Sequence, residues 1–184
     1  MADGSSPVPV LLITGPVGVG KTQTAAAASG VLTERGIRHA CVDLPQVSMA
    51  FPERHDDPWN ERLAHQNLAC MWSNFLAVGT ERLIISRVLE ARSLVTRIAD
   101  AVPGADVVVV RLRAPLDVIE ARIRSRNHAH PEWFLGAAAA LVPAMDEQRV
   151  EDHLVDNARL SIEATAHEVL RVAGWLTPTA RKLG

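Results

Sequence analysis

A glycine-rich segment at residues 15–22, GPVGVGKT, limits the possible folds more than any other feature of the sequence. It fits the pattern G-x-x-x-x-G-K-[ST], whose glycines allow a backbone loop to wrap around phosphate oxygens. Residues 8–14 form a short apolar run rich in branched side chains, which is typical of a strand buried on both faces. Residues 21–35 are rich in alanine and favour a helix. The segment therefore follows a predicted strand and opens a predicted helix, the context in which this pattern binds phosphate.

The residue types in this segment suit the terminal phosphates of ATP. Several backbone N–H groups can point into such a loop, and the helix that begins near Lys21 directs the positive end of its dipole at the same anion. We expect Lys21 to neutralise charge on the β- and γ-phosphates and to act in catalysis, and the Thr22 hydroxyl to bind Mg²⁺. The predicted contacts to ATP within the segment are Gly15, Pro16, Val17, Gly18, Val19, Gly20, Lys21 and Thr22.

Strands and helices alternate along the rest of the chain. Residues 105–112 include four consecutive valines, which need apolar cover on both faces and indicate a central parallel strand. Residues 45–58 contain three prolines and predict an irregular loop. The pattern predicts one α/β domain over residues 1–184, with a flexible arm at 1–7 and a parallel sheet covered by helices on both sides. Further strands are expected at 37–43, 82–86 and 153–156, and further helices at 59–78, 88–102, 115–126, 161–173 and in an alanine-rich stretch ending near residue 149.

The composition argues against several classes of protein. A net charge of -2 over 184 residues gives no basic field, so nucleic acid is not an expected partner. No stretch reaches the roughly 20 apolar residues of a membrane span, and the first residues lack the features of a signal peptide. The two cysteines, Cys41 and Cys70, lie in apolar runs and predict reduced, buried thiols rather than a disulfide. We expect a cytoplasmic protein with no membrane partner, either a monomer or a homodimer.

Asp43 is the acidic residue that the sequence offers for magnesium or base chemistry. The predicted strand 82–86 ends without the acid that usually assists magnesium binding beside such a loop, whereas Asp43 ends the predicted strand before it. We expect Asp43 either to help Thr22 hold magnesium or to act as general base for the hydroxyl of an acceptor. The alternative is a turn aspartate before Pro45, where aspartate is favoured without any catalytic role.

Arg122, Arg124 and Arg126 occupy alternate positions at the end of a predicted helix. They cannot all share one face, but Arg122 and Arg126 are four residues apart and do. Arginines from a mobile segment stabilise the charge that spreads over a phosphoryl group during transfer, so we expect these two to be catalytic and Arg122 also to contact ATP. The polar residues 127–131 are the predicted hinge of that segment. The alternative is a solvated basic helix face.

At these residues the sequence resembles the nucleoside- and nucleotide-kinase-like P-loop proteins, and within them the bacterial tunicamycin-resistance type of ATP-binding protein. The likeness lies in Gln23 directly after the magnesium threonine, in Asp43 shortly before a proline, in a third strand without a terminal acid, in the three arginines, and in residues 151–162. It extends over most of residues 8–173 in motif and order.

The resemblance implies a three-layer P-loop fold with five parallel strands in the order 2-3-1-4-5, flanked by helices. It also implies ATP as the phosphoryl donor and a lid at about residues 122–150. Gln23 is then a contact to the nucleotide, and Asn157, in the turn 156–159, lies beside the adenine. The alternative for that turn is a simple entry into the last helix.

The acceptor of such a protein would lie between the phosphate loop, the end of the second strand and the helical segment that follows. Tryptophan offers a flat face for a base or sugar ring, and an arginine after a strand end suits an anionic acceptor. Trp72, on an apolar helix face, is more typical of a core residue, and we assign Trp133 and Trp175 to packing. The predicted acceptor contacts are Asp43, Trp59, Asn67 and Arg87, with residues 57–58 and Asn74 nearby.

Two functions follow from these residues. The first is an ATP- and Mg²⁺-dependent kinase acting on a small molecule such as a nucleoside, a nucleotide or a nucleoside-type antibiotic. The second is an ATP-binding resistance or regulatory protein that sequesters a ligand without efficient phosphoryl transfer, which the missing acid of the third strand favours. A GTPase switch fits less well, because the sequence contains no N-K-x-D guanine signature.

Overall fold

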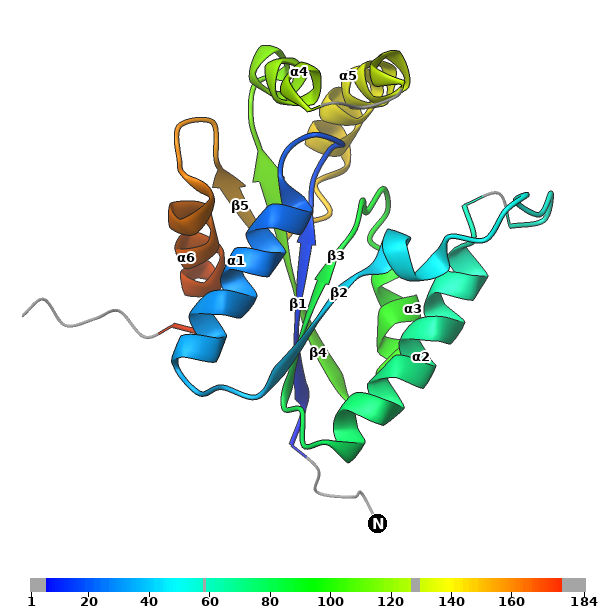
Figure 1. The fold of residues 1–184 in the computed structure, drawn as a ribbon, viewed down its shortest axis with the longest axis vertical. Coiled ribbons are helices and arrows are strands. Elements are labelled where there is room, and N and C mark those ends of the chain that lie inside the picture. The colour runs from blue at the N-terminus through cyan, green and yellow to red at the C-terminus, as the bar shows by residue number, and fades with distance from the viewer. Residues whose placement is uncertain (1–5, 58, 127–129, 177–184) are drawn as a thin grey trace, which may run out of the picture.

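Five parallel strands form the central sheet in the computed structural model, which describes residues 6–57, 59–126 and 130–176 (Figure 1). The sheet order is β2-β3-β1-β4-β5, so the predicted order and the α/β class are confirmed. The strands are β1 Val8–Thr14, β2 His39–Asp43, β3 Arg82–Ser86, β4 Ala105–Arg113 and β5 His153–Asp156. Because every pairing is parallel, the carboxyl ends of all five strands meet at one edge of the sheet.

Helices cover both faces of this sheet and its carboxyl edge (Figure 1). On one face lie α1 (Lys21–Glu34) and α6 (Ile162–Val172), and on the other lie α2 (Glu61–Ala77) and α3 (Leu94–Ala101). At the top of the view α4 (Leu116–Ser125) packs on α5 (Pro131–Gln148), above the strand ends. A short 3-10 helix, η1 (Leu44–Ser48), follows β2. No described helix combines the length and the apolar character that crossing a membrane requires.

Strict alternation along β1 explains why its sequence is apolar at every position. Val10 and Leu12 pack into the core beneath α2 and α3, whereas Leu11 and Ile13 pack into the core beneath α1 and α6. None of the four side chains is more than 1% exposed. Successive strand residues point to opposite faces, so a strand covered on both sides must be apolar throughout.

The helix after β3 is shorter than the sequence pattern indicates, because the chain first makes a buried turn. The predicted helix covered residues 88–102, but α3 begins at Leu94. The Leu89 backbone N–H donates to the Thr14 hydroxyl at 2.8 Å, and the Arg87 N–H donates to the Ile13 carbonyl at 3.2 Å. These bonds hold the turn against the end of β1, beside the glycine-rich loop.

Cys41 and Cys70 are free thiols, as predicted, but their predicted burial is wrong. Cys41 is exposed on β2, on the face opposite the buried Ala40 and Val42, and Cys70 is exposed on α2. β2 is an edge strand, so one of its faces has less cover than those of the central strands. The expected hinge at 127–131 lies partly outside the described residues, as do Pro58 and most of the arm at 1–7.

A matched pair of leucines on α2 tests this layer. Leu68 is fully buried and Leu76 is 50% exposed. We expect Leu68→Ala to lower the free energy of unfolding by about 2–5 kcal/mol, because it leaves a cavity under α2. Leu76→Ala should change it by no more than about 0.5 kcal/mol. Urea denaturation followed by circular dichroism measures both, and equal effects would contradict the placement of α2.

Candidate functional site

The loop between β1 and α1 lies closely against two other elements of the fold. A side chain at Gly15, where φ is 140°, would place its Cβ 2.6 Å from the Leu112 carbonyl oxygen at the end of β4. At Gly18, where φ is 83°, a Cβ would lie 2.6 Å from the Ile123 side chain of α4. Only glycine allows both the left-handed backbone and these contacts. The same lack of side chains leaves the loop amides open toward an anion.

Lys21, the first residue of α1, folds back over this loop. Its Nζ donates to the carbonyl oxygens of Gly15 and Pro16, at 3.0 Å each. Burial lowers the pKa of Lys21 to about 8, with the positive Arg126 acting in the same direction and Asp43 opposing both. The ammonium group therefore lies at the loop without a full counter-charge, which is the environment that an anionic ligand would complete.

Thr22 and Asp43 come together as the sequence predicts. The Thr22 hydroxyl donates to Asp43 Oδ2 at 2.6 Å, across the gap between α1 and the end of β2. Asp43 is the register partner of Ser86, the last residue of β3, so the carboxylate is supplied by the strand next to the one that usually carries it.

This pair fits a magnesium ion bound together with phosphates. Among the described residues no group of three or more His, Cys, Asp or Glu side chains could hold a metal by itself. Mg²⁺ needs no such group, because it usually takes one or two protein oxygens and fills its octahedron with phosphate oxygens and water. A hydroxyl and a carboxylate 2.6 Å apart beside a phosphate-type loop match that requirement.

Arg122 of α4 and Asn157, in the turn after β5, clasp the loop from the side. Arg122 Nη1 donates to the Val19 carbonyl at 3.2 Å, and its Nη2 donates to the Asn157 carbonyl at 2.8 Å. Asn157, 4% exposed, donates its own side-chain N–H to Val19 at 2.9 Å. Burial and the nearby Arg126 lower the pKa of Arg122 below its ordinary value. Three segments distant in sequence thus meet at one carbonyl group.

The other two arginines of this segment differ from each other. Arg126 follows the last residue of α4 with an extended backbone and donates to the Gln23 side chain on α1. Arg124 forms an exposed ion pair with Glu120, one turn earlier, at 3.0 Å. Arg122 and Arg126 therefore lie on the same side, toward the loop, without sharing a helix face, and Arg124, which the resemblance grouped with them, points elsewhere.

A cavity of about 570 Å³ lies on one side of the loop. Its lining includes Gly20, Gln23, Arg122, Arg126 and Asn157, five residues that the sequence assigned to the nucleotide or to phosphoryl transfer. The first turn of α6, with Ser161 as its cap, closes the far wall. A base placed here would lie beside the turn that carries Asn157.

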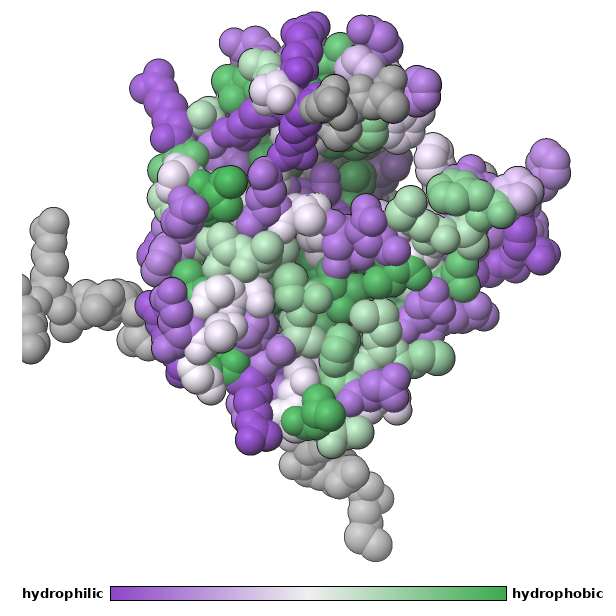
Figure 2. Space-filling model, in the orientation of Figure 1, coloured by the Kyte–Doolittle hydropathy of each residue, from purple (hydrophilic) through white to green (hydrophobic). Residues whose placement is uncertain are grey.

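A second cavity, of about 650 Å³, lies on the other side and touches the loop at Val17. Its walls come from η1, the start of α2, the turn after β3, and α5. Figure 2 shows this face of the molecule hollowed between α4 and α5, at the top of the view, and the segment before α2, at the right. The lining of the cavity is mainly apolar. Two predicted acceptor residues, Trp59 and Arg87, line it.

Trp133 also lines this second cavity, so its assignment to packing is wrong. It is 56% exposed on α5. Sequence reasoning also missed Glu61 and Glu90 in the lining. For α5 the sequence did hold a signal of this wall. Ala137, Ala140 and Leu141 are spaced at i, i+3 and i+4, which places them on one helix face.

Other predicted residues lie outside the cavity lining. The Asn67 side chain donates to the Val47 carbonyl at 2.6 Å and so ties η1 to α2. Asn74 is exposed, whereas Asp57 is 7% exposed and accepts the Arg62 backbone N–H at the start of α2. Trp72 is a core residue, 2% exposed, as predicted. Trp175 packs on the core beneath α1 and α6, with the Arg82 guanidinium 5.3 Å from its ring centre.

Solved structures share this fold. No family model and no curated protein sequence matches the chain. The tunicamycin resistance protein of Deinococcus radiodurans is similar over 94% of this chain and 98% of its own, with a TM-score of 0.64 and 20% identity. A gluconokinase from Sinorhizobium meliloti 1021 is similar over 92% of this chain and 94% of its own, with a TM-score of 0.59 and 16% identity. The APS kinase of Mycobacterium tuberculosis, solved with AMPPNP and APS, is similar over 92% of this chain and 99% of its own, with a TM-score of 0.57 and 19% identity.

These likenesses identify the chain's architecture as that of the P-loop small-molecule kinases. At identities of 20% and below they concern the fold alone. The chemistry of this chain therefore has to be argued from its own residues.

The Lys21 ammonium offers a direct test of the site's electrostatics. The sequence has two lysines, Lys21 and Lys182, so ¹³C-labelling at Cε yields two signals, and Lys182→Arg assigns them. We expect the Lys21 signal to titrate near pH 8 instead of 10.5. Arg126→Gln should raise this pKa because it removes a nearby positive charge, and Asp43→Asn should lower it. A Lys21 midpoint near 10.5 in the wild type would contradict the described site.

Proposed function

We propose that this protein is an ATP- and Mg²⁺-dependent phosphotransferase that acts on a hydroxyl group of a small molecule. The observation that carries the proposal is the position of two cavities on opposite sides of one glycine-rich loop. Val19 and Gly20 line the first and Val17 lines the second. A donor and an acceptor in these cavities would meet over the loop, which is the arrangement that transfer of a phosphoryl group needs.

ATP would occupy the first cavity and the loop. Its adenine lies beside Asn157, its phosphates receive the amides of residues 15–20, and Lys21 turns from the loop carbonyls to the β- and γ-phosphates. Bound Mg²⁺, held through Thr22 and Asp43, supplies neutralisation of phosphate charge. The AMPPNP-bound APS kinase of the same fold supports a nucleotide at this loop.

The transfer forms one bond and breaks one. The acceptor hydroxyl oxygen bonds to the γ-phosphorus as the bond from that phosphorus to the β–γ bridging oxygen breaks, and ADP leaves with the electron pair. Arg122 on α4 and Arg126 directly after it, which both reach the loop region, stabilise the spreading negative charge. The hydroxyl proton passes to Asp43 or, where Asp43 is engaged with the ion, to water.

Sequestration without turnover is a second candidate function. It is favoured by the end of β3, where Ser86 stands in place of an acid and its hydroxyl is buried without a partner among the described residues. A resistance protein among the structures of this fold adds support. In this case both cavities fill, but the site lacks the group that activates the acceptor.

ADP release in a screen of nucleosides, sugars and nucleoside antibiotics separates the two functions. A kinase releases ADP only when an accepted compound is present, and Lys21→Ala should reduce that rate at least about 100-fold, because the transferring phosphoryl loses its main cation. Arg126→Gln should also slow it. Arg124→Gln is the matched control, because its side chain pairs with Glu120 outside the site. Tight binding of a compound with no ADP above background would exclude the kinase in favour of sequestration.

Asp43→Asn tests how the carboxylate acts. We expect ATP affinity to be kept and turnover to fall at least about tenfold, which is 1.4 kcal/mol of barrier. If Asp43 acts through magnesium, the variant should need a higher Mg²⁺ concentration for half-maximal turnover, and excess Mg²⁺ should restore part of the rate. If it is the base, added Mg²⁺ leaves the loss unchanged. Wild-type turnover in the variant would remove Asp43 from the mechanism.

A further inference from the structure

The second cavity is walled mainly by apolar side chains, with aromatic rings on two sides. Trp59 precedes α2 and Trp133 lies on α5, and both are more than half exposed. Ala137, Ala140 and Leu141 give α5 a shallow apolar face toward the same space. Small side chains on the helix face that carries Trp133 leave room for a flat body, and burial of that body would be driven by its apolar surface.

Three charged residues line this cavity, and two of them neutralise each other. Arg87 Nη2 and Glu61 Oε1 are 2.6 Å apart, and the Arg87 side chain is only 7% exposed. Arg87 Nε also donates to the Val88 carbonyl at 2.9 Å, which fixes the plane of the guanidinium. The third charged residue, Glu90, is exposed and has the opposite sign to Arg87.

One hydrogen-bond donor of Arg87 remains unused. Its Nη1 is buried and has no partner among the described residues. A buried N–H without an acceptor is unfavourable by about 1–3 kcal/mol, and more when the group is charged. Because Nη1 is buried, a ligand in the cavity does not contact it in this conformation. Arg87, already paired with Glu61, therefore offers the cavity no unpaired positive charge.

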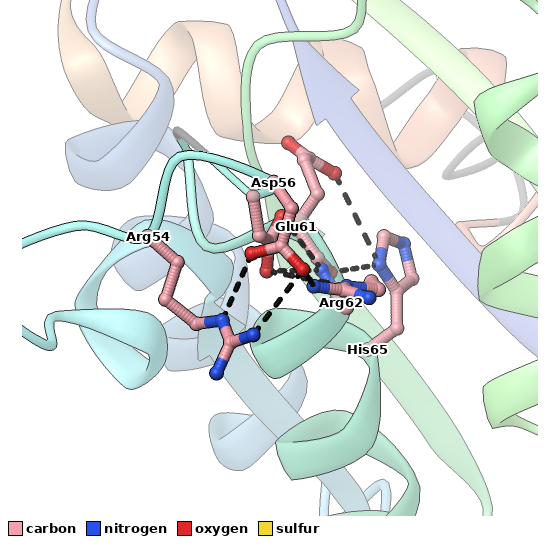
Figure 3. Close-up of polar contacts among 6 residues, drawn as sticks. Arg54, Asp56, Glu61, Arg62 and His65 are labelled. Carbon is pink, nitrogen blue, oxygen red and sulfur yellow. Dashed lines mark hydrogen bonds and ion pairs between the residues drawn. The ribbon is translucent and has the colours of Figure 1, made fainter.

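The two arginines near the start of α2 form ion pairs with a carboxylate other than Glu61. Asp56 pairs with Arg54 at 2.9 Å and with Arg62 at 2.6 Å, as Figure 3 shows at the start of α2. These two arginines hold the pKa of Asp56 well below its usual range, so their own charges are used locally. The second oxygen of Glu61 lies 4.0 Å from His65 Nδ1 (Figure 3).

We propose that this cavity selects an uncharged acceptor with a flat apolar ring, because its walls are mainly apolar and Glu61 neutralises the Arg87 guanidinium. The inference rests on the proposed function and narrows its substrate class. A carboxylate or phosphate on the acceptor would compete with Glu61 for Arg87 and face Glu90 as a like charge. This differs from the anionic acceptor that the position of Arg87 in the sequence suggested.

Glu61→Gln tests the selection, because it keeps the size of the side chain and removes the charge that neutralises Arg87. The probes are 6-(hydroxymethyl)-2-naphthamide and 6-(hydroxymethyl)-2-naphthoate, which differ by a negative charge on one flat ring system. Their affinities are measured by calorimetry with a non-hydrolysable ATP analogue and Mg²⁺ present. The wild type should bind the amide at least about tenfold more tightly, and Glu61→Gln should reduce or reverse that ratio.

Two further variants complete the experiment. Glu81→Gln makes the same change at an exposed residue directly before β3, at the opposite end of that strand from Arg87. This control should keep the wild-type ratio of the two affinities. Glu61→Met combined with Arg87→Met removes the pair without leaving a buried charge, and it should keep binding of the amide because the apolar walls remain. Thermal unfolding of each variant checks that it is folded.

Each outcome bears on the inference separately from the proposed function. Equal affinities in the wild type, a preference for the naphthoate, or a ratio unchanged by Glu61→Gln would overturn the charge argument. Failure of both probes to bind would overturn the flat apolar class. If the preference is found while no acceptor yields ADP, the kinase proposal fails and the selectivity of the cavity stands.

Discussion

The loop between β1 and α1 can lie where it does only because two of its residues have no side chain. Gly15 lies against the Leu112 carbonyl and Gly18 against Ile123, so the ends of β4 and α4 press directly on the loop backbone. Arg122 and Asn157 then bond to the carbonyl of Val19. The loop is thus a shared boundary, and the two cavities are the spaces left on its two sides.

Parallel strands explain why so many polar groups gather at this boundary. Asp43 ends β2, Arg87 follows β3, and Asn157 follows β5, and all three strand ends lie at the same edge of the sheet. The sheet therefore fixes where these residues lie, and the polar side chains themselves stand at or directly after the strand ends. A carboxylate on β2 can reach Thr22 although β3 lies between β2 and β1, because α1 carries the threonine toward it.

Much of the fold and half of the site follow from local patterns. The strand order was an implication of the family resemblance, whereas the alternating strands and helices and the buried Trp72 agree with the sequence, because period and composition express them directly. The shortened α3, the exposed cysteines and the position of Trp133 do not, because each depends on which neighbour covers a surface. The Glu61–Arg87 pair joins residues 26 apart, and no local pattern marks it.

The amino-acid sequence by itself determined a strand, a glycine loop and a helix with Lys21 and Thr22 at its start, because backbone geometry and hydrogen bonding at that turn are local. It also determined a sheet buried on both faces, since an apolar run such as β1 tolerates no other place. Only the tertiary structure decided which charges meet. It neutralised Arg87 with Glu61, because electrostatic contacts depend on distance in space and not on distance along the chain.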